Sequence, residues 1–422
     1  MSDNAGYEPS DFCAAVTPAA REALVERQLA ALAAREDVVR AFVCHDTEAA
    51  RRRVAAAPPG PLAGALVGVK DIIATEAFPT RYGSHDPNAA AGPRRDAWCV
   101  GQLLLLGGTV LGKTVCTEFA YPLPGPTTNP HDARRTPGGS SSGSAAAVAA
   151  GFVSFALGTQ TAGSTIRPAS YCGVTGFKPS YGLLHAEGVQ AISTTCDHLG
   201  IFARSPRDAW YFASALATNQ PDIVAPRRPR RVLVLRLPPE VPQGEAYPER
   251  LAALAIALRR DGVLAEVIDL PFPIADFRTL QQDLCYWEAA RILLPPGPVR
   301  PVPQLRALLG PYLERDIADY AAARRRRQDY QAQFAALAAG CDAVLLPAAT
   351  GIAPPLADTG DAVMSRFWTA LHVPAMTVPL WHSAEGLPLG LQLLGGLGAD
   401  RTLAEIAQWF LWRGYATSSS AG

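Results

Sequence analysis

The chain has 422 residues, of which 49% are hydrophobic, and its 38 basic and 38 acidic side chains give a formal net charge of zero. This composition is typical of a globular chain with a sizeable core. A neutral balance offers no electrostatic basis for binding nucleic acid or an anionic membrane surface, so we expect a small-molecule partner, no nucleic acid and no membrane.

The cellular location can be predicted from the first residues, the apolar runs and the cysteines. The first 16 residues lack a basic region followed by an apolar run, so no secretory signal is visible. The longest apolar run, residues 145–158, is shorter than the roughly 18 residues that a spanning helix needs. The eight cysteines are scattered without a C-x-x-C pair, which favours reduced, small hydrophobic side chains over disulfides or zinc ligands. We therefore predict a cytoplasmic protein with no metal and no cofactor.

Two helices are predicted near the start of the chain. Pro18 suits a first helical turn, and leucines follow it at helical spacing; a second helix is predicted near residues 47–57. Prolines and a glycine at residues 58–61 end this pair, which we expect to form a packing layer. Residues 65–73 then predict a buried strand.

Lys70 lies inside that predicted strand, next to Asp71. A salt bridge at the strand end is one interpretation, but successive strand side chains point to opposite faces, so these two cannot easily pair. Apolar neighbours would remove water from Lys70, lower its pKa and allow a neutral amine to act as a base. Lys70 is therefore a candidate catalytic base.

Residues 107–114 read GGTVLGKT and satisfy the phosphate-binding pattern G-x-x-x-x-G-K-[ST] letter for letter. Against a nucleotide site, Val110 and Leu111 place bulky apolar side chains inside the loop, and no convincing strand ending in aspartate follows. Residues 101–106 are also typical of the end of a helix. We therefore predict that the two glycines end a helix and that residues 109–111 form a strand.

The segment at residues 135–182 carries the strongest functional pattern. Two loops of small residues, 138–144 and 159–164, flank an apolar run. Such Gly and Ser runs are typical of flexible linkers in isolation, but a linker would continue into polar residues. The flanks instead predict a buried helix that ends near Gly151 and a strand at 152–157, with both loops facing the core.

The second loop is suited to holding an anion, because small side chains let backbone N–H groups approach a ligand closely. The amides of Thr161, Ala162, Gly163 and Ser164 can converge on one point and stabilise negative charge on a carbonyl oxygen, as an oxyanion hole does. Ser164 would then be the nucleophile, which needs a base. No histidine lies in this stretch. A Ser-His-Asp triad is not excluded by that, since its members are neighbours in space, but nothing in the sequence supports one.

A βαβ-like unit is predicted further along the chain. Residues 232–235 and 265–269 read as strands on either side of an amphipathic helix at 247–260. This unit belongs to a region that spans residues 206–334.

Two features of that region leave alternatives open. The arginine run at residues 324–327 favours a solvated helix face over a site for an anionic partner. Tyr286, Trp287 and other aromatic residues either line a pocket or pack in a core, and the sequence pattern does not separate these two interpretations.

Three separated motifs carry a resemblance to a known family. They are GVKD at 68–71, GGSSSGS at 138–144 and GTQTAGS at 158–164, followed by PA at 168–169 and GFKP at 176–179. In order and spacing they resemble the amidase signature family. Three further segments resemble later parts of that family's sequences: CDAVLLP at 341–347, VPA at 373–375 and LPLGLQ at 387–392. The resemblance covers about residues 60–205 and 335–412.

The resemblance implies an α/β fold, an α/β/α sandwich in which a large mixed, twisted sheet is covered by helices on both faces. It also implies a single domain over residues 1–422. Within it we expect N-terminal helices at 1–60, a catalytic core at 61–205, a variable substrate-shaping region at 206–334 and a C-terminal completion of the sheet at 335–415.

In that family a lysine, a serine preceded by a cis peptide bond and a later nucleophilic serine form a catalytic relay. The family's spacing between the serines matches 164 − 140 = 24 here, which selects Ser140, and the GVKD match supplies Lys70. The resemblance therefore implies that Lys70, Ser140 and Ser164 are catalytic. It implies an amidohydrolase that cleaves a small carboxamide to a carboxylate and ammonia or an amine through an acyl-enzyme.

The segment after Ser164 departs from the common family pattern GGSIRxPA. Ala162 replaces a glycine, and the arginine stands at the third position after the serine, as Arg167. This position resembles malonamidase-type members, in which the corresponding arginine holds a substrate carboxylate, a group that a guanidinium suits well. Arg167 is thus a candidate substrate-binding residue for a compact half-amide of a dicarboxylic acid. The alternative is an internal ion pair that stabilises the loop.

Two functions of different classes follow from the resemblance. The first is the amide hydrolase. The second is a glutamine-amidotransferase-type subunit that passes ammonia to a partner protein on transfer RNA, although the sequence carries no special basic or exposed apolar signature for docking. A homodimer is also open.

Overall fold

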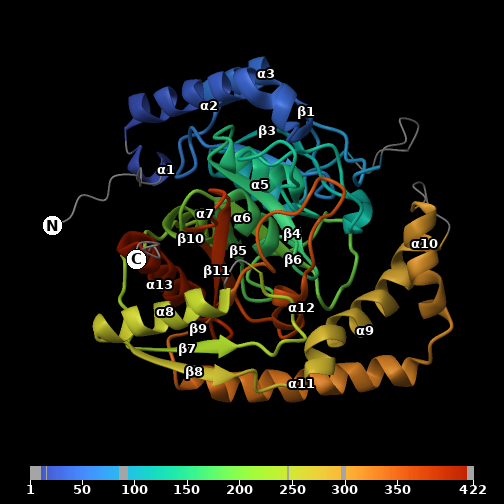
Figure 1. The fold of residues 1–422 in the computed structure, drawn as a ribbon. Helices are drawn as coiled ribbons and strands as arrows, with labels where there is room; N and C mark the ends of the chain where they lie inside the picture. The colour runs from blue at the N-terminus through green and yellow to red at the C-terminus, as the bar shows by residue number, and fades with distance from the viewer. Residues whose placement is uncertain (1–10, 16, 85–93, 245–246, 296–300, 416–422) are drawn as a thin grey trace.

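The computed structural model describes residues 11–15, 17–84, 94–244, 247–295 and 301–415. The strands are β1 (Phe42–His45), β2 (Leu66–Lys70), β3 (Thr109–Thr114), β4 (Phe155–Gln160), β5 (Thr175–Lys178), β6 (His198–Ala203), β7 (Arg231–Arg236), β8 (Leu264–Asp269), β9 (Ala343–Pro347), β10 (Ala375–His382) and β11 (Pro388–Leu394). They form one 11-stranded sheet in the order β1-β3-β2-β4-β6-β5-β10-β11-β9-β7-β8 (Figure 1).

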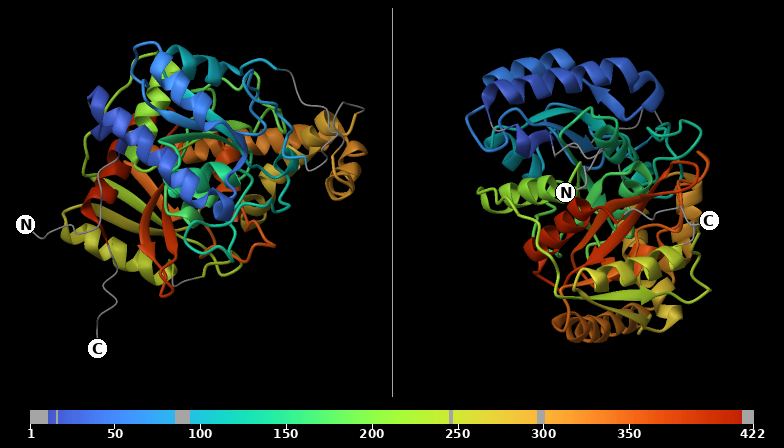
Figure 2. Two further views of the ribbon diagram at one scale, coloured as in Figure 1. Left: turned by 90° about the horizontal axis from the view of Figure 1, so that it is seen from above. Right: turned by 60° about the vertical axis from the view of Figure 1, so that its left-hand side comes forward.

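The α-helices are α1 (Asp11–Ala14), α2 (Pro18–Val39), α3 (Thr47–Ala56), α4 (Trp98–Leu105), α5 (Ser142–Ala149), α6 (Ile166–Cys172), α7 (Pro206–Thr218), α8 (Tyr247–Arg260), α9 (Ile274–Leu293), α10 (Pro303–Leu309), α11 (Ile317–Ala339), α12 (Val363–Ala370) and α13 (Asp400–Arg413). Two short 3₁₀ turns are η1 (Glu118–Ala120) and η2 (Gly310–Leu313). The helices α2 and α3 lie at the opposite end of the molecule from α11 (Figures 1 and 2).

The sheet is mixed. β2 runs parallel to β3 and β4, and β7 runs parallel to β8 and β9, whereas β5 with β10 and β10 with β11 are antiparallel pairs. Parallel strands occur where helices cover both faces of a sheet. Accordingly, β2, β3 and β4 are buried along their whole length.

Helices cover both faces of this sheet, as the resemblance predicted. On one face, residues of α4, α7, α8 and α13 share a hydrophobic cluster with Phe155 and Leu157 of β4. On the other face, α2, α5 and α6 cluster with Ala156, while α9, α11 and α12 cluster with β7 and β9. The alternation of these three β4 residues is the period of two that a strand imposes. The predicted α/β/α sandwich is confirmed.

The two predicted N-terminal helices are confirmed as α2 and α3. Thr17 caps α2 by accepting a hydrogen bond from the Ala20 amide at 3.2 Å, and Pro18 follows in the first turn. The short strand β1 lies between them, although the sequence did not predict it. It pairs antiparallel with β3 at the edge of the sheet. Because an edge strand of four residues buries little, its sequence carries little strand signal.

The structure excludes a phosphate-binding loop at residues 107–114. The helix α4 ends just before the glycines and β3 begins just after them, as predicted, so the GKT triplet lies inside a buried strand. The Lys113 side chain is fully buried, where it donates to Thr80 Oγ1 at 2.8 Å and to the Ile73 carbonyl. This lysine cannot reach a phosphate.

The strand predicted at 152–157 begins later, since β4 spans Phe155–Gln160. Gly151 adopts a φ of +76° after α5, and the Phe152 amide turns back to the Ala147 carbonyl at 2.9 Å. This helix-ending turn consumes the first apolar residues of the predicted strand.

The predicted βαβ unit is confirmed by β7, α8 and β8. The arginine run on α11, in contrast, is only partly a solvated face. Arg324 and Arg325 are exposed, but Arg326 forms ion pairs with carboxylates of α9. Arg327 is buried with its guanidinium beside His372, because α11 packs on α9 and turns this side of the run inward.

Three other expectations concern membrane-spanning helices, the cysteines and the N-terminal stretch. Within the described residues, no helix has the length and apolar character needed to cross a bilayer. All eight cysteines lie in the described part of the chain and are free thiols. The stretch inspected for a secretory signal lies mainly in residues 1–10, outside the described residues.

Candidate active site

Lys70 lies at the carboxyl end of β2 and is completely buried. Its Nζ lies 2.8 Å from Ser140 Oγ and 2.7 Å from Thr159 Oγ1. Burial lowers the pKa of the Lys70 amine to about 8, because charge is disfavoured away from water. The neutral form of this amine is therefore much more populated near physiological pH than that of an ordinary, exposed lysine.

Asp71 points away from Lys70, as the strand geometry predicted. Its carboxylate accepts hydrogen bonds from the Arg81 and Gly83 amides, each at 3.1 Å, and lies 4.0 Å from Lys113 Nζ. Lys70 and Asp71 therefore have different partners, and Lys70 is the one that contacts Ser140.

Ser140 lies in a tightly packed loop between residue 136 and α5. Gly138 has a φ of +83°, and a Cβ there would come within 2.9 Å of the Tyr171 ring, so the position requires glycine. The Gly139–Ser140 peptide bond is cis, as the resemblance implied. The Ser140 carbonyl accepts from the Thr117 amide at 3.1 Å. Thr117 thus holds the Ser140 backbone, and Lys70 Nζ holds its side-chain hydroxyl.

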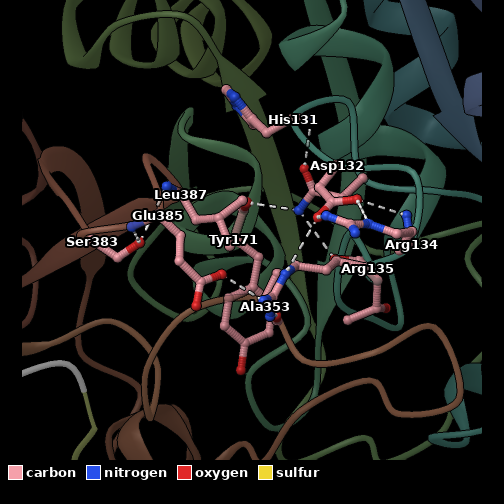
Figure 3. Close-up of polar contacts among 11 residues, drawn as sticks. His131, Asp132, Arg134, Arg135, Tyr171, Ala353, Ser383, Glu385 and Leu387 are labelled. Atoms are coloured by element: carbon pink, nitrogen blue, oxygen red, sulfur yellow. Dashed lines mark hydrogen bonds and ion pairs between the residues drawn. The ribbon is translucent and has the colours of Figure 1, made fainter.

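The segment that leads into this loop is anchored through the side chain of Arg135, which reaches residues of two distant segments (Figure 3). Its Nη1 donates to the Ala353 carbonyl at 2.8 Å and its Nη2 to Glu385 Oε2 at 2.7 Å. Asn129 adds hydrogen bonds to the carbonyls of Thr136 and Tyr171. Residues far apart in the chain therefore anchor the start of the serine loop.

The loop at residues 161–164 connects β4 to α6, and three of its carbonyl groups are turned toward protein donors. The Thr161 carbonyl accepts from Gln281 Nε2 at 2.9 Å, and the Ala162 carbonyl accepts from Thr369 Oγ1 at 2.7 Å. The Gly163 carbonyl accepts from the amide of Arg167 at 3.0 Å. Within the described residues, the four amides of this loop donate to no protein acceptor. They are free to bind an anion.

Gln160 and Asp197 position this loop further. Gln160 Oε1 accepts from the amides of Thr165 and Ile166 at the start of α6. Asp197 Oδ1 accepts from Thr161 Oγ1 at 2.6 Å, and burial raises the pKa of its carboxyl to about 6. Sequence reasoning missed both residues. Gln160 stands inside the third motif and was the only one with a local signal.

Ser164 opens onto a cavity of about 350 Å³, which Thr161, Ala162 and Arg167 also line. Lys70 and Ser140 are buried behind this loop. β4 connects the two sets, because its Thr159 contacts Lys70 while its next residues lead directly to Ser164. The structure thus brings Lys70 and Ser140 into contact and places Ser164 in the wall of the cavity, on the loop with the free amides.

Arg167 lies in the same cavity wall and is only 5% exposed. Its Nη2 donates to the Gly139 carbonyl at 2.6 Å, while its Nε has no partner within the described residues. No carboxylate of the described chain pairs with it, so the internal ion pair considered from the sequence is absent there. Burial lowers the pKa of this guanidinium. The nearby Arg366 is neutralised by Asp361 at 2.7 Å.

The histidines of the described chain do not line this cavity. His198 and His372 pack instead with Tyr181, whose ring stacks on His372 at a centroid distance of 4.1 Å. His85 lies outside the described residues. Of the two aromatic residues left open, Tyr286 lines the cavity, and Trp287 stacks on a tyrosine of α11.

Comparison with known proteins identifies the family of this chain. The sequence matches the family described as Amidase over residues 23–261, more than half of the chain. Among curated proteins, one of the subunits of the glutamyl-tRNA(Gln) amidotransferase from Roseiflexus sp. (strain RS-1) is 31% identical over 91% of both chains. Among solved structures, an amidase is 30% identical with a TM-score of 0.83, covering 93% of this chain and 96% of the other. The native peptide amidase from Stenotrophomonas maltophilia is 27% identical with a TM-score of 0.79, covering 98% of each chain. In sequence and in fold, this chain belongs to the amidase signature family of enzymes that act on amide C–N bonds.

Proposed function

We propose that this enzyme hydrolyses a carboxamide to a carboxylate and ammonia or an amine, with Lys70, Ser140 and Ser164 acting as a relay. The observation that carries the proposal is the fully buried Lys70 amine at 2.8 Å from Ser140 Oγ, with its pKa lowered to about 8. A neutral amine can accept a proton, and Ser140 is the group through which that proton would arrive.

The reaction proceeds in two halves. Ser164 Oγ attacks the amide carbon, and this attack forms a C–O bond and a tetrahedral oxyanion. The proton of the Ser164 hydroxyl passes through Ser140 to Lys70 at the same time. The proton then returns along the relay to the amide nitrogen, the C–N bond breaks, and ammonia or an amine leaves the acyl-enzyme. Water attacks the ester by the reverse route, giving the carboxylate and free Ser164.

The free amides of residues 161–164 are the proposed oxyanion hole. The carbonyls of Thr161 and Ala162 are held by Gln281 and Thr369, so these peptide units cannot rotate to use their amides elsewhere. Donors that are fixed before the reaction stabilise the developing charge without reorganising.

The rate is expected to rise with pH and to level off above an apparent pKa near 8. Lys70 is protonated below this value and cannot accept a proton, whereas the neutral amine dominates above it. The measurement is kcat/KM for a non-ionising amide from pH 5 to 9, with thermal melting at each pH to exclude unfolding. A profile that stays flat through this range removes the lysine base from the proposal.

The substrate is proposed to carry a carboxylate near the scissile amide, which Arg167 would bind. The guanidinium is buried, lines the cavity beside Ser164 and has no carboxylate partner within the described residues. Asp361 and Asp358 attract this charge without forming an ion pair with it, so a substrate anion in direct contact would complete the site.

Arg167→Ala is expected to cost roughly 2–5 kcal/mol of transition-state binding for an amide with an adjacent carboxylate. The matched neutral amide should lose much less. Because the change also removes the bond to the Gly139 carbonyl, the ratio of kcat/KM between the two substrates is the quantity to measure. Equal losses on both substrates, with a lower melting temperature, would assign Arg167 to the loop alone.

A second candidate function is ammonia delivery within an amidotransferase complex, because curated relatives at 31% identity are named as subunits of such an enzyme. The isolated chain distinguishes the two functions. Rapid ammonia release from several small amides without any partner supports the hydrolase, whereas slow release from glutamine alone supports the amidotransferase. A homodimer and a cytoplasmic location stay predictions, the first of which sedimentation would check.

A further inference from the structure

The cavity beside Ser164 extends along one face of α9. Its wall there begins at Gln281, whose Nε2 donates to the Thr161 carbonyl at 2.9 Å, and continues through Cys285 and Ala289 to Leu293. Residues four apart lie on one face of a helix. The interval from 281 to 293 is 293 − 281 = 12 residues, or about 18 Å of helix, so the wall reaches far beyond the reactive loop.

The charged side chains of this wall lie at the reactive end. Within the described residues they are Arg167, Asp361 and Arg366. The last two come from the segment at 360–366, which packs directly against Gly163. Beyond Gln281 and Gln282, the α9 wall becomes apolar apart from the Tyr286 hydroxyl. The cavity therefore has a polar end at Ser164 and an apolar end away from it.

The apolar end is a hydrophobic cluster of its own. Leu293 of α9 and Leu305 and Leu309 of α10 join Phe119 and Ile192 in a cluster separate from those that cover the two sheet faces. These side chains also line the cavity of about 350 Å³. That volume is within the range of about 300–1,000 Å³ typical of small-molecule sites. A compact half-amide would leave most of this wall uncovered.

We propose that an extended apolar group of the substrate occupies the cavity between α9 and α10. The enzyme then acts on amides that carry a linear aliphatic or arylalkyl chain, and any carboxylate of the substrate lies at the polar end. Burying such a chain against these side chains is favourable in proportion to the apolar area removed from water. This inference rests on the proposed amide hydrolysis at Ser164 and adds the substrate class to it.

Binding to Ser164→Ala protein tests the inference without turnover. Propionamide, hexanamide and octanamide are titrated calorimetrically into this variant. The dissociation constant is expected to fall about fourfold for each added methylene, as the transfer free energy of a buried CH₂ requires. The heat-capacity change of binding should become more negative along the series. A dissociation constant independent of chain length overturns the inference.

Variants of the apolar end locate the binding site. Ala289→Phe, made in the Ser164→Ala background, places a ring in the middle of the cavity and should reduce the octanamide-to-propionamide affinity ratio at least about tenfold. Ala335→Phe, on the exposed side of α11, adds the same side chain outside the cavity and should keep the ratio. Leu308→Trp, at a half-buried position of α10, shortens the cavity and serves if Ala289→Phe fails to fold. An unchanged ratio in a folded cavity variant contradicts the site.

Ammonia release by the wild-type enzyme separates this inference from the proposed function. Equal kcat/KM for all three amides, abolished by Ser164→Ala, would leave hydrolysis standing and overturn the apolar site. Chain-length-dependent binding without any release would support the apolar site and contradict hydrolysis of these amides. A rise of kcat/KM with chain length that Ala289→Phe removes supports both.

Discussion

Replacing Ser164 by alanine is expected to reduce amide hydrolysis by about four to six orders of magnitude, because no hydroxyl is left to attack the carbonyl carbon. The fold should be kept. Ser164 is nearly buried, yet its hydroxyl has no hydrogen-bond partner within the described residues, so its removal leaves no protein group unsatisfied. Ammonia release and thermal melting of the same preparation measure the two effects.

A covalent probe supplies the matching control for Ser164. A serine-directed fluorophosphonate should add one mass increment to the wild-type protein and none to Ser164→Ala. Near wild-type turnover in the variant, with unchanged melting, would show that another group attacks the amide. Labelling of the variant at an equal rate would point to the same conclusion.

The geometry of the candidate site could be predicted as far as the motifs reach. Lys70 and Ser140 stand 70 positions apart in the chain, and the motifs alone indicated that they belong together. The structure places their side-chain atoms in contact and adds Thr159, which holds the other side of the amine. Their roles in the reaction stay predictions until they are tested.

The residues that hold the cavity loop could not be predicted from local patterns. Gln281 belongs to α9 and Thr369 to α12, yet both donate to carbonyls of residues 161–162. Any side chain with a donor of suitable length can make such a bond, so no sequence pattern identifies it. Only the packing of α9 and α12 against this loop reveals these contacts.

The elements were predictable where burial imposes a clear period. β2 and β4 are buried on both faces and appear in the sequence as apolar runs. β1 is short and half exposed at the sheet edge, which leaves it without such a signal. The burial of Arg327 could not be predicted from the sequence, because it depends on which face α11 turns toward its neighbours.

Lys70→Met and Ser140→Ala are each expected to lower kcat by about three orders of magnitude or more, and their double variant is expected to be no worse than either alone. A relay fails completely when one member is lost, so a second loss removes nothing further. Methionine keeps the length and apolar stem of the lysine in its buried site. The measurement is a double-variant cycle on kcat at pH 8, with melting temperatures recorded for every protein.

Two matched controls separate the relay from the general cost of altering this buried region. Lys113 is also fully buried with a pKa lowered to about 8, but it contacts Thr80 and the Ile73 carbonyl rather than a serine of the loop. Lys113→Met should therefore reduce stability while the folded fraction keeps its turnover. Ser142→Ala, two positions beyond Ser140 in the same run, should remain close to wild type. If the Lys70 and Ser140 losses multiply instead, the two residues act independently, because only a shared proton path makes one loss mask the other. If Lys113→Met is as inactive as Lys70→Met while fully folded, the loss at Lys70 reflects the removal of a buried lysine and not of the catalytic base.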